Sequence, residues 1–266
     1  MHPVRVSGGF LVLAHQRRER IRQLLQARQT ASVVDLSQAF SVSASTIRRD
    51  LQDLEDQGRV RREHGGAIAT PTVQAMPEPP ILQRAAEQSA QKERIGQAAA
   101  ALVREGETVF LGSGTTTEQV AWHLRAYQSL TVLTNALNIV HILHESPGIT
   151  IVLVGGLLRK TESSLVGPLT EQATKDLRAD KVIIGIRAVH PQIGLTNDTL
   201  METQTDRAII QCAPELIVVA DNTKIGRVAA SFVAPVTAIN ILVTDADAPA
   251  DVVDVLRSAG VRVELA

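Results

Sequence analysis

The chain has 266 residues, with 27 lysines and arginines against 28 acidic residues and a formal net charge of −1. This length suits one large domain or two modest ones. Aromatic residues make up only 2%, which argues against a module that stacks single-stranded nucleic acid on aromatic side chains. The single cysteine, Cys212, excludes a disulfide scaffold. No apolar run reaches the roughly 18 residues of a membrane span, so we expect a cytoplasmic protein without a membrane partner.

The neutral total charge is an average over two unlike parts. Residues 1–66 contain eleven arginines, no lysine and seven acids, a net charge of +4, whereas residues 67–266 carry −5. Such asymmetry points to a nucleic-acid-binding end, although a solvated basic face gives the same signal. Four prolines between Ala69 and Pro80 indicate a linker. The predicted organisation is a small domain at 15–68, a linker at 69–80 and a large domain at 81–266, with no clear periodicity over residues 1–13.

The small domain has the pattern of a winged helix-turn-helix. Apolar residues at helical spacing after Arg17 predict a first helix, and Ser32-Val-Val-Asp35 resembles a capping box that begins a second. Residues 41–43 form a short turn, and Ser43 is a suitable N-cap for a third helix that runs to about Gln57. Gly58 follows as its stop.

The third helix has an apolar face, Ile47, Leu51 and Leu54, that we expect to pack inward. The polar residues opposite suit insertion into a DNA major groove, where an arginine bridges O6 and N7 of guanine. The predicted base-reading residues are Ser45, Thr46, Arg48 and Arg49. Residues 59–66 then predict a wing that touches phosphates through Arg61, Arg62 and His64. An exposed charged helix is the alternative for the arginine pair alone.

The large domain alternates short β-rich runs with helical patterns, which is typical of an α/β fold with a mostly parallel sheet. The predicted strands are 108–111, 130–134, 149–154, 181–184, 216–220, 239–244 and 261–265; the predicted helices are 93–103, 118–127, 136–144, 169–177 and 250–259. Ligands bind such sheets beyond the carboxyl ends of the strands.

The loop after the first strand, Gly112-Ser-Gly-Thr-Thr-Thr117, predicts a phosphate site. Glycines allow a close approach of the backbone, and the following helix contributes free N–H groups and its positive dipole end. We expect Ser113, Gly114, Thr115, Thr116 and Thr117 to hold the anion. The loop is neither a Walker A motif nor a dinucleotide fingerprint, and a Thr-capped turn without a ligand is the alternative.

Polar residues follow other strands at the same predicted edge. Arg159 and Lys224 are candidates to hold an anion, and Asn135, Glu202 and Asp221 are candidates to bind sugar hydroxyls. A metal site at His141 and His144 lacks a third ligand at a suitable spacing. We therefore expect no metal and no cofactor.

Several segments resemble the DeoR family of bacterial transcriptional regulators. In the small domain they are 40–51, 54–58 and 62–67, with the sequences FSVSASTIRRDL, LEDQG and REHGGA. In the large domain they are KERI at 92–95, GSGTTT at 112–117, TN at 134–135, GGLLR at 155–159, GLT at 194–196 and DNTKIG at 221–226. Two positions depart from the family pattern: Gly112 stands where the family commonly has Asp, and Ala188 where it commonly has Gly.

The resemblance implies a winged helix-turn-helix followed by a sensor domain similar to ribose-5-phosphate isomerase. It further implies a repressor of carbohydrate metabolism genes, which associates with the nucleoid, binds double-stranded operator DNA and responds to a phosphorylated sugar. A homo-oligomer, dimer or tetramer, is expected, and no catalytic residue is assigned. The alternative is a sugar-phosphate isomerase with an added DNA-binding domain, using Glu202, Asp221 and Lys224 as acid and base groups.

Overall fold

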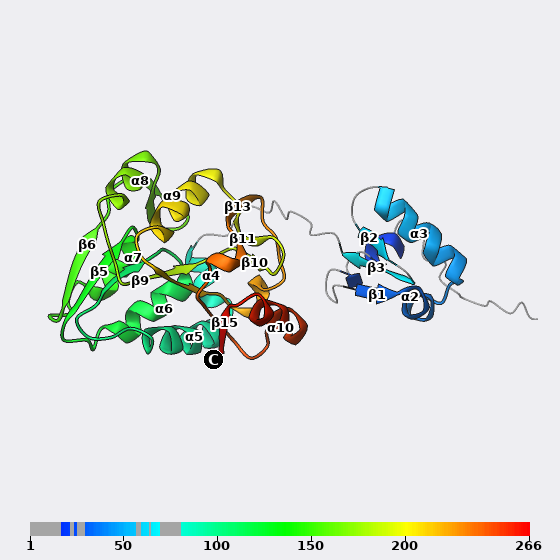
Figure 1. Cartoon of the computed structure of the whole chain (residues 1–266), viewed down its shortest axis with the longest axis horizontal. Coiled ribbons are helices and arrows are strands. Elements are labelled where there is room, and N and C mark those ends of the chain that lie inside the picture. The colour runs from blue at the N-terminus through cyan, green and yellow to red at the C-terminus, as the bar shows by residue number, and fades with distance from the viewer. Residues whose placement is uncertain (1–16, 22–23, 26–29, 57–59, 64, 70–80) are drawn as a thin grey trace, which may run out of the picture. The chain divides into compact units, whose positions relative to one another are not determined.

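The computed structural model describes residues 17–21, 24–25, 30–56, 60–63, 65–69 and 81–266. The chain divides into two compact units, residues 1–72 and 73–266 (Figure 1). Each unit has its own buried apolar core. We describe each unit separately.

The first unit is a winged helix-turn-helix, as the sequence predicts. Helical residues 17–21 and 24–25 come first. The elements that follow are β1 (Thr30–Ser32), α2 (Val33–Phe40), α3 (Ala44–Asp56), β2 (Val60–Glu63) and β3 (Gly66–Ala69). The three strands form an antiparallel sheet in the order β1-β3-β2. Strand β1 was not predicted, since three residues are too few for an alternating pattern.

Side-chain caps define where the helices of this unit begin. The Ser32 hydroxyl accepts a hydrogen bond from the Asp35 N–H at 3.1 Å, and the Ser43 hydroxyl accepts one from the Thr46 N–H at 3.2 Å. Both predicted N-caps are therefore confirmed. Ser41 ends α2 in the left-handed region, with φ 52°, which produces the tight turn between the two helices.

The core of the first unit lies between its helices and its sheet. Ile47, Leu51 and Leu54 of α3 are buried, as predicted. Two ion pairs join the first helical segment to α3: Arg17 Nε lies 2.6 Å from an Asp50 carboxylate oxygen, and Arg18 lies 2.5 Å from Asp53. Part of the arginine excess of this unit thus stabilises the domain itself.

The second unit is built on a seven-stranded parallel sheet with the order β15-β14-β12-β9-β4-β5-β6. Its strands are β4 (Thr108–Leu111), β5 (Leu130–Thr134), β6 (Ile149–Leu153), β9 (Lys181–Gly185), β12 (Glu215–Val219), β14 (Ile241–Thr244) and β15 (Arg262–Leu265). All seven predicted strands are confirmed. Neighbouring strands pair in parallel throughout this sheet.

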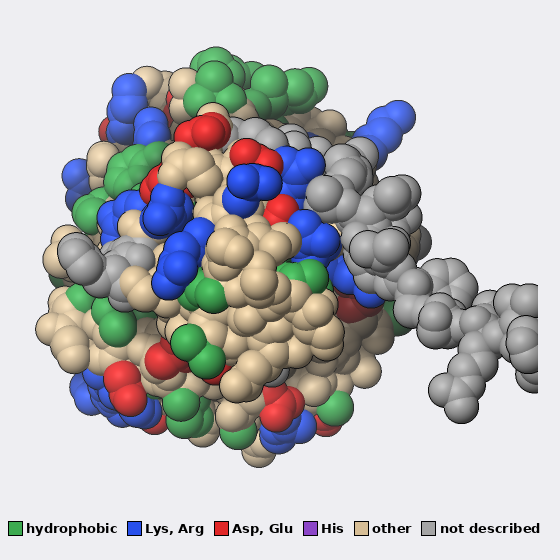
Figure 2. All heavy atoms as spheres, turned by 90° about the vertical axis from the view of Figure 1, so that its right-hand side faces the viewer, with side chains coloured by type: hydrophobic (Ala, Val, Ile, Leu, Met, Phe, Trp, Pro, Cys, Tyr) green, Lys and Arg blue, Asp and Glu red, His purple; other side chains and the backbone are tan. Residues whose placement is uncertain are grey.

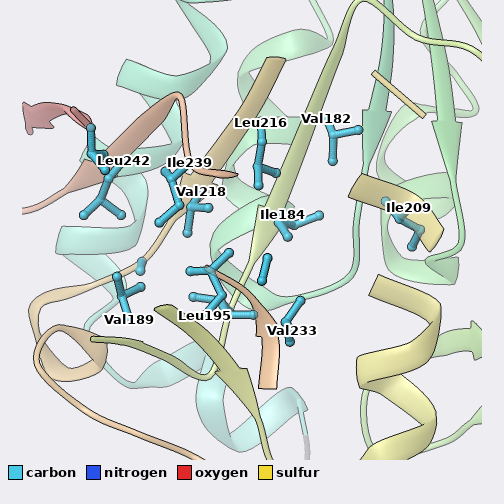
Figure 3. Packing of buried hydrophobic residues seen from close by; sticks show 14 of the residues in the cluster. Val182, Ile184, Val189, Leu195, Ile209, Leu216, Val218, Val233, Ile239 and Leu242 are labelled. Atoms are coloured by element: carbon cyan, nitrogen blue, oxygen red, sulfur yellow. The ribbon is translucent and has the colours of Figure 1, made fainter. Parts of the chain in front are cut away.

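Helices cover both faces of the sheet (Figure 1). On one face lie α5 (Ser89–Ala100), α6 (Thr115–Leu124) and α7 (Leu137–Leu143); on the other lie α9 (Leu200–Ile210) and α10 (Ala250–Ser258). Side chains alternate along each strand. In β12, Ile217 and Val219 therefore pack with the first group, whereas Leu216 and Val218 pack with the second (Figure 3).

Smaller elements surround the seven-stranded sheet, and most were not predicted. They are α4 (Ile81–Ala86), the antiparallel pair β7 (Leu157–Arg159) and β8 (Ser164–Val166), α8 (Pro168–Thr174), and the sheet of β10 (Ala188–His190), β11 (Gly194–Asn197) and β13 (Ser231–Ala234). Two short 3-10 helices span Asn222–Lys224 and Val236–Ala238. Helices α5 and α6 each begin earlier than predicted, at Ser89 and Thr115.

Within the described ranges, none of the helices has the length and apolar character needed to cross a lipid bilayer.

Candidate DNA-binding surface and effector pocket

Helix α3 presents a polar surface opposite its buried face. Arg48, Arg49 and Ser45 are exposed. The Ser43 hydroxyl lies 2.8 Å from the hydroxyls of both Ser45 and Thr46, so these side chains gather at the start of the helix. The two arginines follow Thr46 after one intervening residue, Ile47, in the first half of the helix, where a recognition helix contacts base edges.

The wing places further arginines beside this helix. Arg61 and Arg62 lie on β2 and are exposed. The Arg62 N–H donates to a Glu55 carboxylate oxygen at 2.9 Å, and its guanidinium donates to Gln52. These contacts fix the wing against the carboxyl-terminal half of α3. His64, the third predicted wing residue, lies outside the described residues. Figure 2 shows Lys and Arg side chains (blue) exposed on the surface, with Asp and Glu side chains (red) among them.

The second unit contains a cavity of about 420 Å³ at the carboxyl edge of its sheet. This volume is within the range of small-molecule sites. Its charged and polar lining comes from loops and helices far apart in the sequence: Arg84, Glu87, Gln88, Lys92, Ser113, Thr115, Thr116, Glu162, Arg187, Asn197, Glu202, Asp206, Asp221, Thr223 and Lys224. Ser113, Gly114, Thr115 and Thr116 of the predicted phosphate loop thus line it.

The phosphate loop leads directly into the first turn of α6. Gly114 has φ +132°, a conformation that favours glycine. The first-turn N–H groups of a helix have no acceptor within it and attract anions. Thr117, in contrast, is fully buried, does not line the cavity, and donates its hydroxyl to the Gly114 carbonyl at 2.9 Å. The hydrogen bond from Thr117 to the Gly114 carbonyl therefore maintains the conformation of the phosphate loop.

Basic side chains converge on one part of the cavity. Burial lowers the pKa of Lys92, and the nearby positive charges of Lys224 and Arg84 lower it further, whereas Asp221 opposes the change. Burial likewise lowers the pKa of Lys224; Asp221 opposes this change, and the positive charges of Arg187 and Arg84 add to it. Like charges that depress one another's pKa values form a region suited to an anion.

Carboxylates gather at another part of the cavity. Glu202 and Asp206 lie one turn apart on α9, and Glu162 lies in the turn between β7 and β8. Arg159 lies among them: its Nη1 is 3.2 Å from Glu202 Oε1 and 3.9 Å from Glu162 Oε2. Burial and the charges of Glu202 and Glu162 raise the pKa of Asp206 well above its ordinary value. The cavity therefore has a basic part and an acidic part.

The remaining predicted effector residues lie in different positions. Glu202, Asp221 and Lys224 line the cavity, whereas Arg159 lies behind Glu202. Asn135 is not brought to the cavity. Its side-chain N–H donates to the Leu165 carbonyl at 2.9 Å, so it holds β8 over the end of β5. Asp221 accepts from the Thr223 N–H at 3.0 Å and begins the 3-10 helix that carries Lys224.

The structure gives a packing reason for one departure from the family pattern. A side chain at Gly112 would place its Cβ 2.9 Å from Cγ2 of Ile184, so an aspartate does not fit there without a shift of Ile184. Ala188, the other departure, is buried in β10.

Sequence reasoning missed eight charged or amide residues of the cavity: Arg84, Glu87, Gln88, Lys92, Glu162, Arg187, Asn197 and Asp206. Lys92 lies within the KERI segment, and Asp206 follows Glu202 at the helical spacing of four, so these two carried a usable signal. Arg84 and Glu162 did not, because they lie on short elements without periodicity. Among the described residues, no group of three His, Cys, Asp or Glu is placed to hold a metal ion.

Comparison with known proteins gives the relationships of both units. Residues 17–72 match the DeoR-like helix-turn-helix domain, and residues 87–246 match the DeoR C-terminal sensor domain. The glycerol-3-phosphate regulon repressor of Escherichia coli is 34% identical over 250 residues, 94% of this chain and 98% of the relative. The transcriptional repressor AccR of Agrobacterium fabrum is 34% identical over 230 residues, 86% and 88% of the two chains.

Among solved structures, ribose 5-phosphate isomerase A of Methanocaldococcus jannaschii aligns with a TM-score of 0.39 and 16% identity, covering 52% of this chain and 55% of the enzyme. The two matched domains occur in the same order as the two structural units, and the relatives align over nearly their full length. The chain belongs to the DeoR family of transcriptional regulators.

Proposed function

We propose that this protein is a transcriptional repressor whose affinity for operator DNA is set by a phosphorylated sugar. The main observation in favour of DNA binding is the polar face of α3. Arg48 and Arg49 are exposed on this face, opposite the buried Ile47 and Leu51. Each arginine that pairs with a guanine contributes about 1–3 kcal/mol of discrimination. The full-length match to named repressors supports this assignment.

The two-part cavity supports a phosphorylated sugar as the effector. Phosphate suits the region formed by the loop at 113–116, Lys92 and Lys224, since charge-assisted hydrogen bonds to such groups are strong. Sugar hydroxyls are donors, and the carboxylates of Glu162 and Glu202 are acceptors. Binding alters DNA affinity only if the ligand favours one of two states of the protein, with a coupling typically of about 1–3 kcal/mol.

A homo-oligomer is part of this proposal. Helix-turn-helix proteins bind paired half-sites, and a two-fold symmetric oligomer presents two recognition helices at the matching spacing. Sedimentation of the full-length protein measures its oligomeric state. A monomer at the protein concentration that binds operator DNA would contradict the proposed homo-oligomer.

The test is an electrophoretic mobility shift with the full-length protein and DNA from upstream of its own gene and the neighbouring genes. Sugar phosphates and glycerol 3-phosphate are added one at a time, with each unphosphorylated sugar as the control. We expect a specific shift that one phosphorylated compound removes. No specific shift on any fragment would overturn the DNA-binding assignment, and a shift that no compound alters would overturn the effector assignment.

We further propose that the protein is a sensor rather than an enzyme. Glu202, Asp221 and Lys224 share the cavity, so an isomerase remains the competing function. The carboxylate of Asp221 is engaged by Thr223, and Glu202 is paired with Arg159, which supports a binding role for both. Turnover of pentose or hexose phosphates that is abolished by Glu202→Gln would establish the enzyme instead.

A further inference from the structure

Helix α4 is the segment through which the sensor unit connects to the preceding part of the chain. Its first residue, Ile81, is the first described residue after the proline-rich segment. The Ile81 N–H donates to the Thr161 carbonyl at 2.8 Å, which attaches the start of α4 to the turn between β7 and β8. At the other end of α4, the buried Lys92 ammonium donates to the carbonyls of Arg84 and Glu87, at 2.5 Å each.

Arg84 extends from α4 into the lining of the effector cavity. Its guanidinium forms an ion pair with Glu162, which also lines the cavity, and both side chains are nearly buried, at 12% and 4% exposure. This pair joins residues 78 positions apart. It is therefore a second link, beside the Ile81 hydrogen bond, between α4 and the β7–β8 turn.

Arg84 also belongs to the group of cations that suits an anion. Its charge acts on both Lys92 and Lys224, which places it electrostatically within the basic part of the cavity. Glu162 belongs to the acidic part, with Arg159 Nη1 at 3.9 Å. If Arg84 were withdrawn, Glu162 would keep a positive neighbour. The Arg84–Glu162 pair thus joins the two parts, and an anion bound beside Lys92 and Lys224 would compete with Glu162 for the same guanidinium.

We propose that Arg84 is a ligand-binding residue that exchanges partners: a bound phosphate takes the guanidinium from Glu162 and thereby weakens the attachment of α4 to the β7–β8 turn. This inference rests on the proposed sugar-phosphate function. It names a route by which the cavity reaches the DNA-binding unit, since α4 is continuous in sequence with the linker. Loosening α4 detaches from the sensor unit the element that follows the linker in sequence, and repression is released.

The first experiment measures the affinity of the full-length protein for inorganic phosphate by calorimetry in a phosphate-free buffer. Arg84→Met lowers the affinity about tenfold or more, as expected for the loss of one charge-assisted hydrogen bond. Glu162→Gln removes the competing carboxylate and raises the affinity about fivefold, a typical coupling between residues in contact. When Arg84→Met is already present, adding Glu162→Gln no longer raises the affinity for phosphate. Arg94→Met, an exposed arginine on α5, is the matched control and leaves the affinity unchanged.

The second experiment measures amide hydrogen exchange of the same proteins with and without phosphate. In the wild type, phosphate slows exchange in the 112–118 loop and speeds exchange in residues 81–87. In Arg84→Met, which lacks the ion pair, residues 81–87 exchange fast under both conditions. Should this variant fail to fold, Glu162→Gln serves in its place, because it also breaks the pair and is expected to remove the phosphate effect on α4.

The possible outcomes separate the two proposals. If phosphate does not slow amide exchange in residues 112–118, the proposed effector site is wrong. If phosphate slows exchange in residues 112–118 but leaves exchange in residues 81–87 unchanged or slower, the effector site is supported and the proposed role of Arg84 is wrong. An increase in affinity from Glu162→Gln that persists without Arg84 would overturn it as well.

Discussion

The side-chain N–H of Asn197 donates to the carboxylate of Asp206 at 2.6 Å, while the side-chain oxygen Oδ1 of Asn197 accepts a hydrogen bond from the Arg187 backbone N–H at 3.2 Å. Asn197 thereby connects β11 to α9 on the acidic side of the cavity. Burial, together with Glu202 and Glu162, raises the pKa of Asp206 well above its usual 3.8. At pH values between 3.8 and the folded-state pKa, the folded state therefore holds a proton that the unfolded state has lost.

Asp206→Asn should change how stability depends on pH. With a raised pKa in the folded state, the contribution of Asp206 is fully present below about pH 3.8 and is lost as the pH rises through the folded-state pKa. The amide keeps an acceptor for Asn197 and cannot ionise. The free energy of unfolding of the variant, measured in urea, should therefore exceed that of the wild type at about pH 8 and approach it at about pH 4. Asp176→Asn, at an exposed position, is the control; equal pH profiles for Asp206→Asn and wild type would contradict this.

The acidic part of the cavity should discriminate against ligands that carry a carboxylate in addition to the phosphate. Whichever aldose phosphate stabilises the protein in a thermal-shift assay is compared with its aldonate, which differs by an added negative charge. We expect the aldonate to bind about tenfold more weakly or worse, because placing like charges together costs several kcal/mol. Glu202→Gln should reduce the difference in affinity between the aldose phosphate and its aldonate. Equal binding of the two compounds would show that Glu162, Glu202 and Asp206 do not face the sugar.

Lys224→Ala should weaken the effector response without affecting DNA binding. Lys224 lies in the basic part of the cavity, and the loss of one charge-assisted contact corresponds to about 1.5–3 kcal/mol. Operator affinity without effector should match the wild type, while the effector concentration that releases DNA should rise at least about tenfold. Lys175→Ala, an exposed lysine after α8, controls for loss of charge. A wild-type response curve for Lys224→Ala would place the effector elsewhere.

Arg49→Ala should weaken operator binding by about 1–3 kcal/mol, the contribution of one arginine–guanine pair. Thermal stabilisation by the effector should persist, since Arg49 lies on α3 of the first unit. Arg94→Ala removes an exposed arginine from the sensor unit and should leave operator affinity intact. An operator affinity for Arg49→Ala equal to that of the wild type would rule out base reading by this residue.

Gly96→Ala should destabilise the sensor unit although alanine is the better helix former. A Cβ at this position would lie 2.5 Å from the Gln119 Cβ and 2.7 Å from its backbone carbon. The propensity gain is about 1 kcal/mol, whereas overpacking costs about 1–3 kcal/mol or more, so the clash should dominate. Gly155→Ala, where a Cβ meets nothing within 4 Å, is the matched control. A higher melting temperature for Gly96→Ala than for the wild type would mean that α5 and α6 can move apart.

The sequence predicts this fold well where periodicity is strong. The seven strands of the parallel sheet are continuous apolar runs, and the buried face of α3 repeats at helical spacing, so both emerge from side-chain pattern alone. The phosphate loop was found for the same reason, because it directly follows one of those strands. Thr117 shows the limit: its residue type suits an anion, but the turn directs its hydroxyl to the Gly114 carbonyl.

The acidic part of the cavity and α4 could not be predicted in this way. Glu162 lies in a four-residue turn between two three-residue strands, and its position depends on how that hairpin folds over β5 through Asn135. Arg84 lies on a six-residue helix, too short for a periodic signal. These residues meet through tertiary contacts that have no counterpart in local sequence.

The position of α4 affects how this protein can be divided into parts. The two matched domains end at residue 72 and begin again at residue 87, so a truncation at those boundaries discards Ile81–Ala86. An isolated sensor domain made in that way would lack the Arg84 wall of its own binding site and the carbonyl of Arg84 that Lys92 bonds. Ligand affinities measured on such a fragment would describe a site that is more open, and less basic, than the one the intact regulator presents.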